Sequence, residues 1–508
     1  MQSNKPEMSR ADQVARAVLV GLLCSVGAFI CMRGAVEAVT DPDVGWHLRT
    51  AQWILDHHAF PHVDPFSRVA GGSPWQAYSW LFDLILLKAY AWMNLRGLLI
   101  FTAAMIALTG AAAYRMISRL QADFTQRAVL TVAVIFCLSQ LSTPRPWLFT
   151  VLFFVIETDI LMHSRKDGDS RELFWLPLLF AVWANIHIQF IDGLLVLGIA
   201  AAEPIVSRWW KSEVHPAPAK KLWLVFGACA AAACLNPYGP GIYKIAWQLG
   251  SQPGVLDTVT EMHALAFRTP GDFVLLFLAL AAAGVLFRYR QLNPFETILL
   301  ALAAVLSFRS GRDLWVMAIA AGAILAAGIP AREENAEAQR QPAWAAALAG
   351  LVAVGAFAAS VLLLNVSNEH LQGLLAEKMP VRAVEVVKER HYSGALFNTY
   401  DWGGYLIWTL REPVSIDGRA ALYGDKAIGR SRETWGGGAR WASDPDLRSA
   451  GVVIAPEGAA LTQLLRTDTR FERAYEDKVA AIFVARSGSR SSEQNVAQLS
   501  GAGSRQGK

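Results

Sequence analysis

Residues 127–163 read RAVLTVAVIFCLSQLSTPRPWLFTVLFFVIETDILMH, and this stretch decides the fold class. Two apolar runs, 127–143 and 146–163, are separated only by a turn at Thr143-Pro144-Arg145. A helix that crosses a membrane needs about 20 mostly apolar residues, and both runs come close to that length. The stretch therefore predicts two neighbouring membrane-spanning helices joined by a tight turn.

Apolar runs of this length occur along most of the chain. Of its 508 residues 54% are hydrophobic and 17% are charged, whereas a soluble globular chain carries about 25% charged residues. These values exclude a soluble enzyme, a disordered protein and a small disulfide scaffold. The net charge of +4 is too low to indicate a nucleic-acid partner, and the five cysteines follow no metal-binding spacing. We predict an α-helical polytopic membrane protein with eleven spans, at 14–36, 97–115, 127–143, 146–163, 173–188, 190–207, 221–236, 271–287, 293–308, 312–329 and 344–364.

Basic clusters indicate the orientation of these spans. Lys and Arg concentrate on the cytoplasmic side of membrane proteins, and here they follow every second span, as at Arg115 and Arg119 or at Arg288 and Arg290. All of these clusters face the cytoplasm only if residues 76–93 lie at the outer surface as a juxtamembrane helix. The expected topology has a cytoplasmic N-terminus and an outer C-terminal region.

Three parts divide the chain. We expect a transmembrane domain at 1–364 with a first outer loop at 37–75. Residues 365–486 are richer in Gly and charge and predict a small extracytoplasmic α/β domain, and the composition of 487–508 indicates a disordered tail. Within the α/β domain we expect helices at 380–390 and 458–466, a tight turn at Gly403-Gly404, and strands at Ala395–Asn398, Tyr405–Leu410, Pro413–Ile416, Gly451–Ala455 and Ala480–Val484.

The first outer loop is dense in polar chemistry. Asp41 and Asp43 follow the first span directly, and Trp46 and His47, both candidates for substrate binding, come next on an expected helix. A carboxylate pair at a membrane surface suits a general base or the binding of a divalent cation, Mg or Mn. The alternative is that Asp41 or Asp43 caps the helix beginning near Val44.

Further polar residues lie at the outer ends of the expected spans. Charged groups at such positions are candidates for function, and arginines on the outer side favour an anionic partner such as a lipid phosphate. The alternative is snorkelling or structural pairing. The candidates for substrate binding here are Arg145, Asn185, His187, Arg309 and Arg312.

The expected C-terminal domain contributes two more segments, FNTYDWGGYLIW and VSIDGRAALYGD. Asp401 in the first, and Asp417 and Arg419 in the second, are further candidates for substrate binding. Neither segment is a phosphate-binding loop or a nucleophile elbow, and hairpin turns in a packed core are the alternative interpretation.

These segments also carry a family resemblance. The Asp-x-Asp then Trp-His pattern, the stretch HVDPFS, and the segments RPWLFTVLFF, WANIHIQFIDGLL, LNPYG, YDWGGYLIW and IDGRAALYGD resemble a largely uncharacterised group of bacterial membrane proteins in the GT-C glycosyltransferase superfamily. The resemblance spans about residues 38 to 425. YDWGGYLIW is also faintly similar to an acceptor-recognising segment of oligosaccharyltransferase catalytic subunits.

The resemblance implies a location and a reaction. Proteins of this kind lie in the bacterial cytoplasmic membrane and transfer sugars on its outer side from polyprenyl-phosphate donors. It places Asp43 as the catalytic base, with Asp41 second, and leaves the acceptor (lipid, glycan or protein) open. An arginine, Arg145, stands where many relatives carry a second carboxylate, so metal use also stays open. The alternatives are a transporter or flippase of a lipid-linked anionic molecule and a non-catalytic membrane assembly protein.

Overall fold

The computed structural model describes residues 9–168, 170–210, 219–251, 262–290, 292–330, 343–392 and 394–486. Contacts divide the chain into two compact units. Unit 1 comprises residues 1–39 and 78–371, and unit 2 comprises 40–77 and 372–508. Residues 40–77 thus group with residues 372–508, although the two segments are far apart in the sequence.

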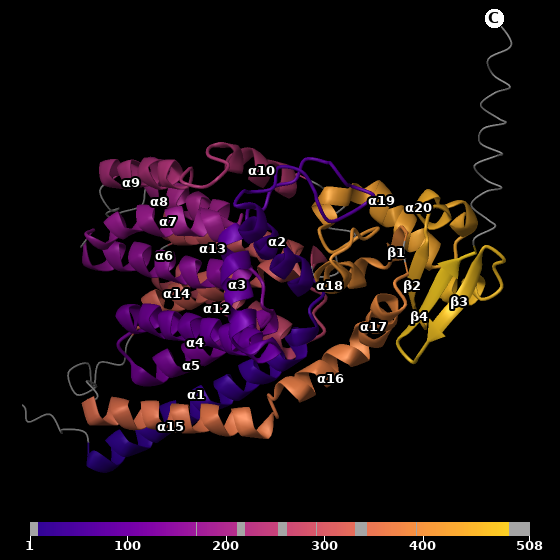
Figure 1. The fold of residues 1–508 in the computed structure, drawn as a ribbon. Helices are drawn as coiled ribbons and strands as arrows, with labels where there is room; N and C mark the ends of the chain where they lie inside the picture. The colour runs from indigo at the N-terminus through magenta and orange to yellow at the C-terminus, as the bar shows by residue number, and fades with distance from the viewer. Residues whose placement is uncertain are drawn as a thin grey trace, which may run out of the picture. The chain divides into compact units, whose positions relative to one another are not determined.

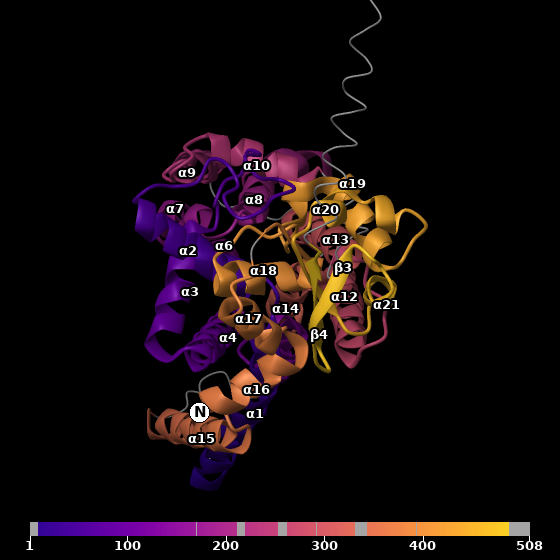
Figure 2. The same cartoon turned by 45° about the vertical axis from the view of Figure 1, so that its right-hand side comes forward.

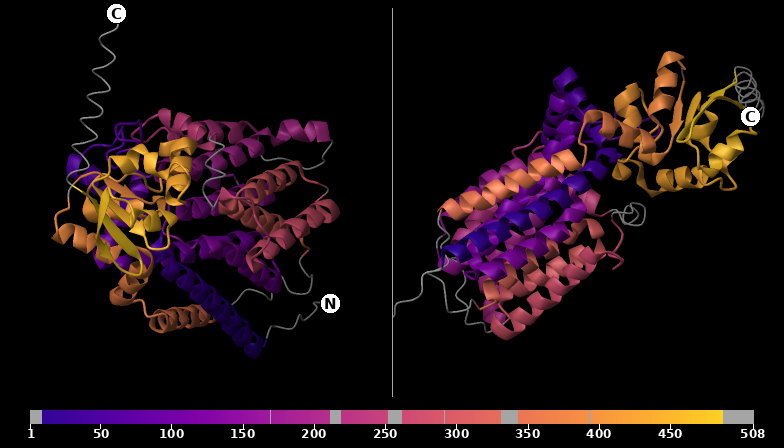
Figure 3. Two further views of the ribbon diagram at one scale, coloured as in Figure 1. Left: turned by 90° about the vertical axis from the view of Figure 1, so that its right-hand side faces the viewer. Right: turned by 90° about the horizontal axis from the view of Figure 1, so that it is seen from below.

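Unit 1 is built of helices, most of which run alongside one another (Figures 1 and 3). Each of the eleven expected spans contains a helix. The helices are α1 (Arg10–Glu37), α3 (Trp80–Met93), α4 (Leu95–Leu120), α5 (Phe124–Leu138), α6 (Trp147–Asp167), α7 (Leu176–Ile186), α8 (Phe190–Trp210), α9 (Ala219–Ala232), α10 (Gly241–Gly250), α12 (Pro270–Tyr289), α13 (Pro294–Arg309), α14 (Leu314–Gly328) and α15 (Ala343–Leu363), followed by α16 (Asn368–Lys378), which links to unit 2.

Helix α14 forms the centre of unit 1. Nearly all of its side chains are buried, and it contacts α4, α5, α6, α12 and α13. A helix that is apolar on every face packs stably only when other helices surround it. The pair α1 and α15 packs along its length, with Gly21 against Val352.

Six helices in the described residues are long and apolar enough to cross a membrane. They cover Leu95–Leu120, Phe124–Leu141, Trp147–Asp167, Phe190–Trp209, Pro270–Tyr289 and Gly311–Gly328. The protein is therefore a multi-pass membrane protein, as the sequence predicts. The count of eleven spans stays a prediction, as does the surface position of 76–93, where α3 has 14 residues.

The two ends of unit 1 differ in their polar groups. At the C-terminal end of α6, Lys166 donates to the backbone carbonyl of Arg119 at 2.8 Å, and Arg165 pairs with Glu203. Arg115 and Arg119 pair with Asp159 nearby. The other end of α6, 21 residues away and thus about 30 Å distant, carries Arg145 and the candidates around it. The basic residues Arg119, Arg165 and Lys166 therefore lie at the opposite end of α6 from Arg145.

Unit 2 contains a four-stranded sheet in the order β1-β2-β4-β3 (Figure 1), and its strands β3 and β4 face the viewer in Figure 2. Strand β1 (Leu396–Asn398) is parallel to β2 (Val452–Pro456), and β4 (Ala480–Ala485) is antiparallel to both β2 and β3 (Phe471–Glu476). Alternate residues face opposite cores: Ile454 and Ile482 pack into one, and Val453 and Phe483 into the other.

The helices of unit 2 are α2 (Val44–His57), α17 (Val381–Glu389), α18 (Tyr400–Leu410), α19 (Ala420–Trp435), α20 (Pro445–Arg448) and α21 (Ala460–Leu465). The predictions of strands at Ala395–Asn398, Gly451–Ala455 and Ala480–Val484 are confirmed. Two predictions are wrong: a strand at Tyr405–Leu410 and a turn at Gly403-Gly404. Both segments lie in helix α18. Pro413–Ile416 forms only one bridge, between Ser67 and Val414, and strand β3 was not predicted.

Candidate active site

The carboxylates of Asp41 and Asp43 have different local surroundings. Asp41 Oδ1 accepts a hydrogen bond from the backbone N–H of Asp43 at 2.9 Å, which closes the turn before α2. Asp43 is the N-cap residue of α2, yet its side chain makes no capping hydrogen bond. The capping alternative considered from the sequence therefore does not explain the Asp43 carboxylate, which is largely buried.

Close backbone packing sets where Asp43 points. Helix α2 lies against α18 so tightly that a Cβ on Gly45 would be 2.1 Å from the carbonyl oxygen of Gly404. A Cβ on Gly418 would be 1.9 Å from Asp43 Oδ1. The glycines of YDWGGY and IDGR thus serve close contact between the first outer loop and the segments that follow β1.

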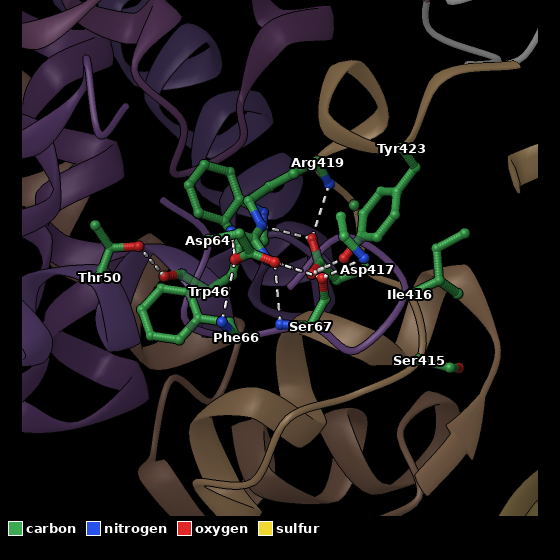
Figure 4. A network of polar contacts seen from close by, with 12 residues as sticks. Trp46, Thr50, Asp64, Phe66, Ser67, Ser415, Ile416, Asp417, Arg419 and Tyr423 are labelled. Carbon is green, nitrogen blue, oxygen red and sulfur yellow. Dashed lines mark hydrogen bonds and ion pairs between the residues drawn. The ribbon is translucent and has the colours of Figure 1, made fainter. Parts of the chain in front are cut away.

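A buried ionic network holds the first outer loop to the IDGR segment (Figure 4). Arg419 Nη1 donates to Asp64 Oδ1 at 2.7 Å, and Arg419 Nη2 donates to Asp417 Oδ2 at 2.6 Å. Tyr423 also donates its hydroxyl proton to Asp417, and the Ser67 hydroxyl donates to Asp64. Every charge in the network has a partner, as burial requires.

The surroundings of Arg419 keep it charged. Burial by itself lowers the pKa of Arg419, but the carboxylates of Asp417 and Asp64 outweigh that effect and raise it. Burial beside Asp417 raises the pKa of Tyr423 well above its usual range, so its hydroxyl stays a donor. Asp417 and Arg419, expected from the sequence to bind substrate, are engaged in this internal network, which favours a structural role.

Three other predicted residues of unit 2 lie near the start of helices. The rings of Trp46 and His47 stack with centroids 3.6 Å apart, and Trp46 Nε1 is buried without a hydrogen-bond partner in the described part of the chain. Asp401 is exposed in the first turn of α18, where a negative charge stabilises a helix.

Asp41 and Asp43 are the two ligands expected from the sequence for a divalent cation. Among the residues that the structure describes, no three His, Cys, Asp or Glu side chains gather in a way that could hold a metal. Asp41 also uses one oxygen for the turn. Because Mg²⁺ is commonly held by one or two carboxylates together with water and substrate phosphates, metal binding at Asp41 and Asp43 stays a prediction.

In unit 1, two predicted arginines meet at the start of α6. The Cζ atoms of Arg145 and Arg312 lie 4.9 and 6.0 Å from the centroid of the Trp147 ring. Arg312 also interacts electrostatically with Asp192, and its Nε is buried without a hydrogen-bond partner in the described ranges. Arg309, at the end of α13, is exposed instead.

A chain of hydrogen bonds connects three buried side chains, Trp183, Thr150 and His187. The indole N–H of Trp183 donates to Thr150 Oγ1 at 2.9 Å, and Thr150 Oγ1 lies 2.8 Å from His187 Nδ1. Asn185 accepts from the indole N–H of Trp80 and donates to the carbonyl oxygens of Ala181 and Leu235. Asn185 therefore ties α3 and α7 to the end of α9.

Sequence reasoning missed several residues of these clusters. Asp64 was not among the candidates: it accepts hydrogen bonds from the backbone N–H groups of Phe66 and Ser67, as a turn residue does, and it also binds Arg419. Tyr423 and Asp313, which accepts from Gln189 at 2.8 Å, were not singled out. The Pro after Asp64 and the Gly before Arg419 mark turns but carry no signal of their pairing.

The comparisons with known proteins bear on the fold. No family model matches the chain, and no curated protein matches its sequence at a significant level. A solved structure with a similar fold is the crystal structure of ArnT from Cupriavidus metallidurans bound to undecaprenyl phosphate. The two chains share 12% sequence identity with a TM-score of 0.50, over 95% of this chain and 99% of that one. This likeness shows the fold alone: the chain has an ArnT-like fold, and membership of the GT-C superfamily stays an expectation from the sequence.

Proposed function

We propose that this protein is a membrane glycosyltransferase that moves a sugar from a polyprenyl-phosphate donor to an acceptor outside the cytoplasm, with inversion. The observation that carries the proposal is the likeness to ArnT, whose structure holds undecaprenyl phosphate, over nearly the full length of both chains. Because one fold can host several activities, the residues must supply the chemistry.

The proposed base is Asp43. Its carboxylate is held at the start of α2 without a capping role. In the reaction, an acceptor hydroxyl oxygen forms a bond to the anomeric carbon of the sugar while the bond from that carbon to the phosphate oxygen breaks. The hydroxyl proton passes to Asp43, and free polyprenyl phosphate leaves. A base of this kind contributes roughly 10²–10⁴-fold to the rate.

The proposed site for the donor phosphate is the pair Arg145 and Arg312. Two guanidinium groups lie beside one buried indole ring, and the buried Nε of Arg312 has no hydrogen-bond partner among the residues that the structure describes. Charge grows on the leaving phosphate as its bond to the sugar breaks, so fixed cations there stabilise the transition state. The arrangement around Trp147 favours this pair over the exposed Arg309.

The test uses the full-length protein with a panel of polyprenyl-phosphate and polyprenyl-diphosphate sugars. Mass spectrometry would follow the release of free lipid phosphate or diphosphate. We expect Asp43→Asn to release lipid about 10²–10⁴ times more slowly. Asp56→Asn is the matched control, since Asp56 is an exposed carboxylate on the same helix. Arg312→Gln should also be slow, whereas Arg268→Gln, at an exposed arginine, should not.

Each outcome separates the proposal from its rivals. Release by the wild type but not by Asp43→Asn supports the glycosyltransferase and identifies its donor. Equal release by both proteins removes Asp43 as the base. Absence of release across the whole panel, together with movement of the intact donor across vesicles, would replace the enzyme with a transporter. Absence of both favours the assembly protein.

A further inference from the structure

The IDGR segment places one glycine directly against the proposed base. A Cβ built on Gly418 would lie 1.9 Å from Oδ1 and 3.0 Å from Cγ of Asp43. Gly418 does not have a positive φ, so an alanine could adopt its backbone conformation. The need for glycine at this position therefore comes from the space that the Asp43 carboxylate occupies.

The backbone around Gly418 is held on both sides. The carbonyl oxygen of Gly418 accepts a hydrogen bond from the Tyr400 hydroxyl at 2.8 Å. The carbonyl oxygen of Ile416 accepts one from Asn398 Nδ2 at 2.8 Å. On the other side, the Asp417–Arg419 ion pair is buried. A segment held in this way cannot retreat when a side chain is added, so the Asp43 carboxylate would have to move instead.

We propose that Gly418 is a positioning residue for the reaction: the backbone of the IDGR segment is fixed, and its contact with Asp43 sets the direction of the Asp43 carboxylate. This inference rests on the proposed role of Asp43 as base. A misplacement of about 1 Å in a reacting group can cost about 10²-fold in rate. The C-terminal part of unit 2 thereby acts on the chemistry through Asp43 and without touching the substrate.

The kinetic test is Gly418→Ala in the full-length protein with the donor found above. We expect kcat to fall about 10²-fold with little change in KM, since binding is retained while the base is displaced. The acidic limb of the pH profile of kcat, which reports the ionisation of the base, should shift. Simple loss of folded protein would lower kcat at every pH and leave that limb in place.

Two further variants test whether the effect of Gly418→Ala comes from displacement of Asp43. Tyr400→Phe removes the hydrogen bond to Gly418 without adding bulk, and should shift the same limb with a smaller loss of kcat. Gly429→Ala is the matched control, because a Cβ on Gly429 meets nothing within 4 Å. It should behave as the wild type. Unchanged kcat and pH profile in Gly418→Ala, with a slow Asp43→Asn, would overturn the inference while leaving the proposed base intact.

A double-mutant cycle tests the contact between Gly418 and Asp43 by a measurement that needs no enzyme assay. Ala481 in β4 is fully buried, so the labelling rate of a thiol at Ala481→Cys reports opening of unit 2. Gly418→Ala should speed labelling in a background with Asp43, and should have no effect in Asp43→Gly, where the space is vacant. Equal acceleration in both backgrounds would mean that Gly418 does not act through Asp43. If Asp43→Asn proves fully active, the base assignment fails and the positioning role falls with it.

Discussion

Removing Arg419 should destabilise unit 2 more than removing any exposed arginine. Asp64 and Asp417 are both buried, and Arg419→Ala leaves their two negative charges without a cation. Breaking a buried pair by deleting one partner costs about 3–5 kcal/mol. The truncation also removes the contact of the guanidinium with the Trp75 ring, 4.7 Å from its centroid.

The expected loss can be measured as an opening rate. With about 1.36 kcal/mol for each factor of ten, the cost corresponds to roughly 10²–10⁴-fold more frequent opening. Thiol labelling of Ala481→Cys should accelerate by this factor when closing is faster than labelling. The native cysteines, Cys24, Cys31, Cys137, Cys229 and Cys234, all lie in unit 1. Peptide mass spectrometry therefore separates their labelling from that of residue 481.

Arg440 supplies the control for this measurement. Its side chain pairs with Glu433 but is 80% exposed, and exposed pairs contribute little because water screens them. Arg440→Ala should label at the rate of the unsubstituted protein. If Arg419→Ala labels as slowly as Arg440→Ala, the buried network does not stabilise unit 2, and the reasoning from burial and pairing is refuted.

Two other predictions concern packing and buried hydrogen bonds. Gly45→Ala should accelerate the same labelling at least about tenfold, because its Cβ would lie 2.1 Å from the carbonyl oxygen of Gly404, whereas Gly373→Ala, in open space, should not. In unit 1, Thr150→Val leaves the Trp183 indole N–H without its acceptor, at a cost of about 1–3 kcal/mol. A lower melting temperature in detergent, restored by Thr150→Ser, would support this; equal melting of all three proteins would contradict it.

Much of unit 1 could be predicted from the sequence because membrane insertion is a local requirement. A run of apolar residues long enough to span the bilayer becomes a helix, since every backbone polar group must be satisfied within the segment. The runs at 127–143 and 146–163 accordingly overlap α5 and α6. The gathering of Arg145 and Arg312 at one end also follows from the alternation of spans. Their meeting at Trp147 does not, because it depends on the packing of α6 against α14.

The errors in unit 2 have a common cause. Tyr405–Leu410 is rich in residues that favour strands, but Gly404 allows α18 to approach α2 closely as a helix, and Gly403 allows it to approach Ile416. Burial against another segment thus outweighed local preference. Strand β3 escaped prediction because its exposed residues, such as Glu472 and Arg473, leave few apolar positions along it.

Local composition and the spacing of apolar runs suffice to predict a helical membrane protein and the residue types that carry its polar chemistry. The pairing of Asp64 with Arg419, 355 residues further along, and the contact of Gly418 with Asp43 become visible only in the folded chain. Such pairings depend on how segments distant in the sequence pack against each other. The residues next to Asp64 and next to Gly418 do not indicate which segment each of them contacts.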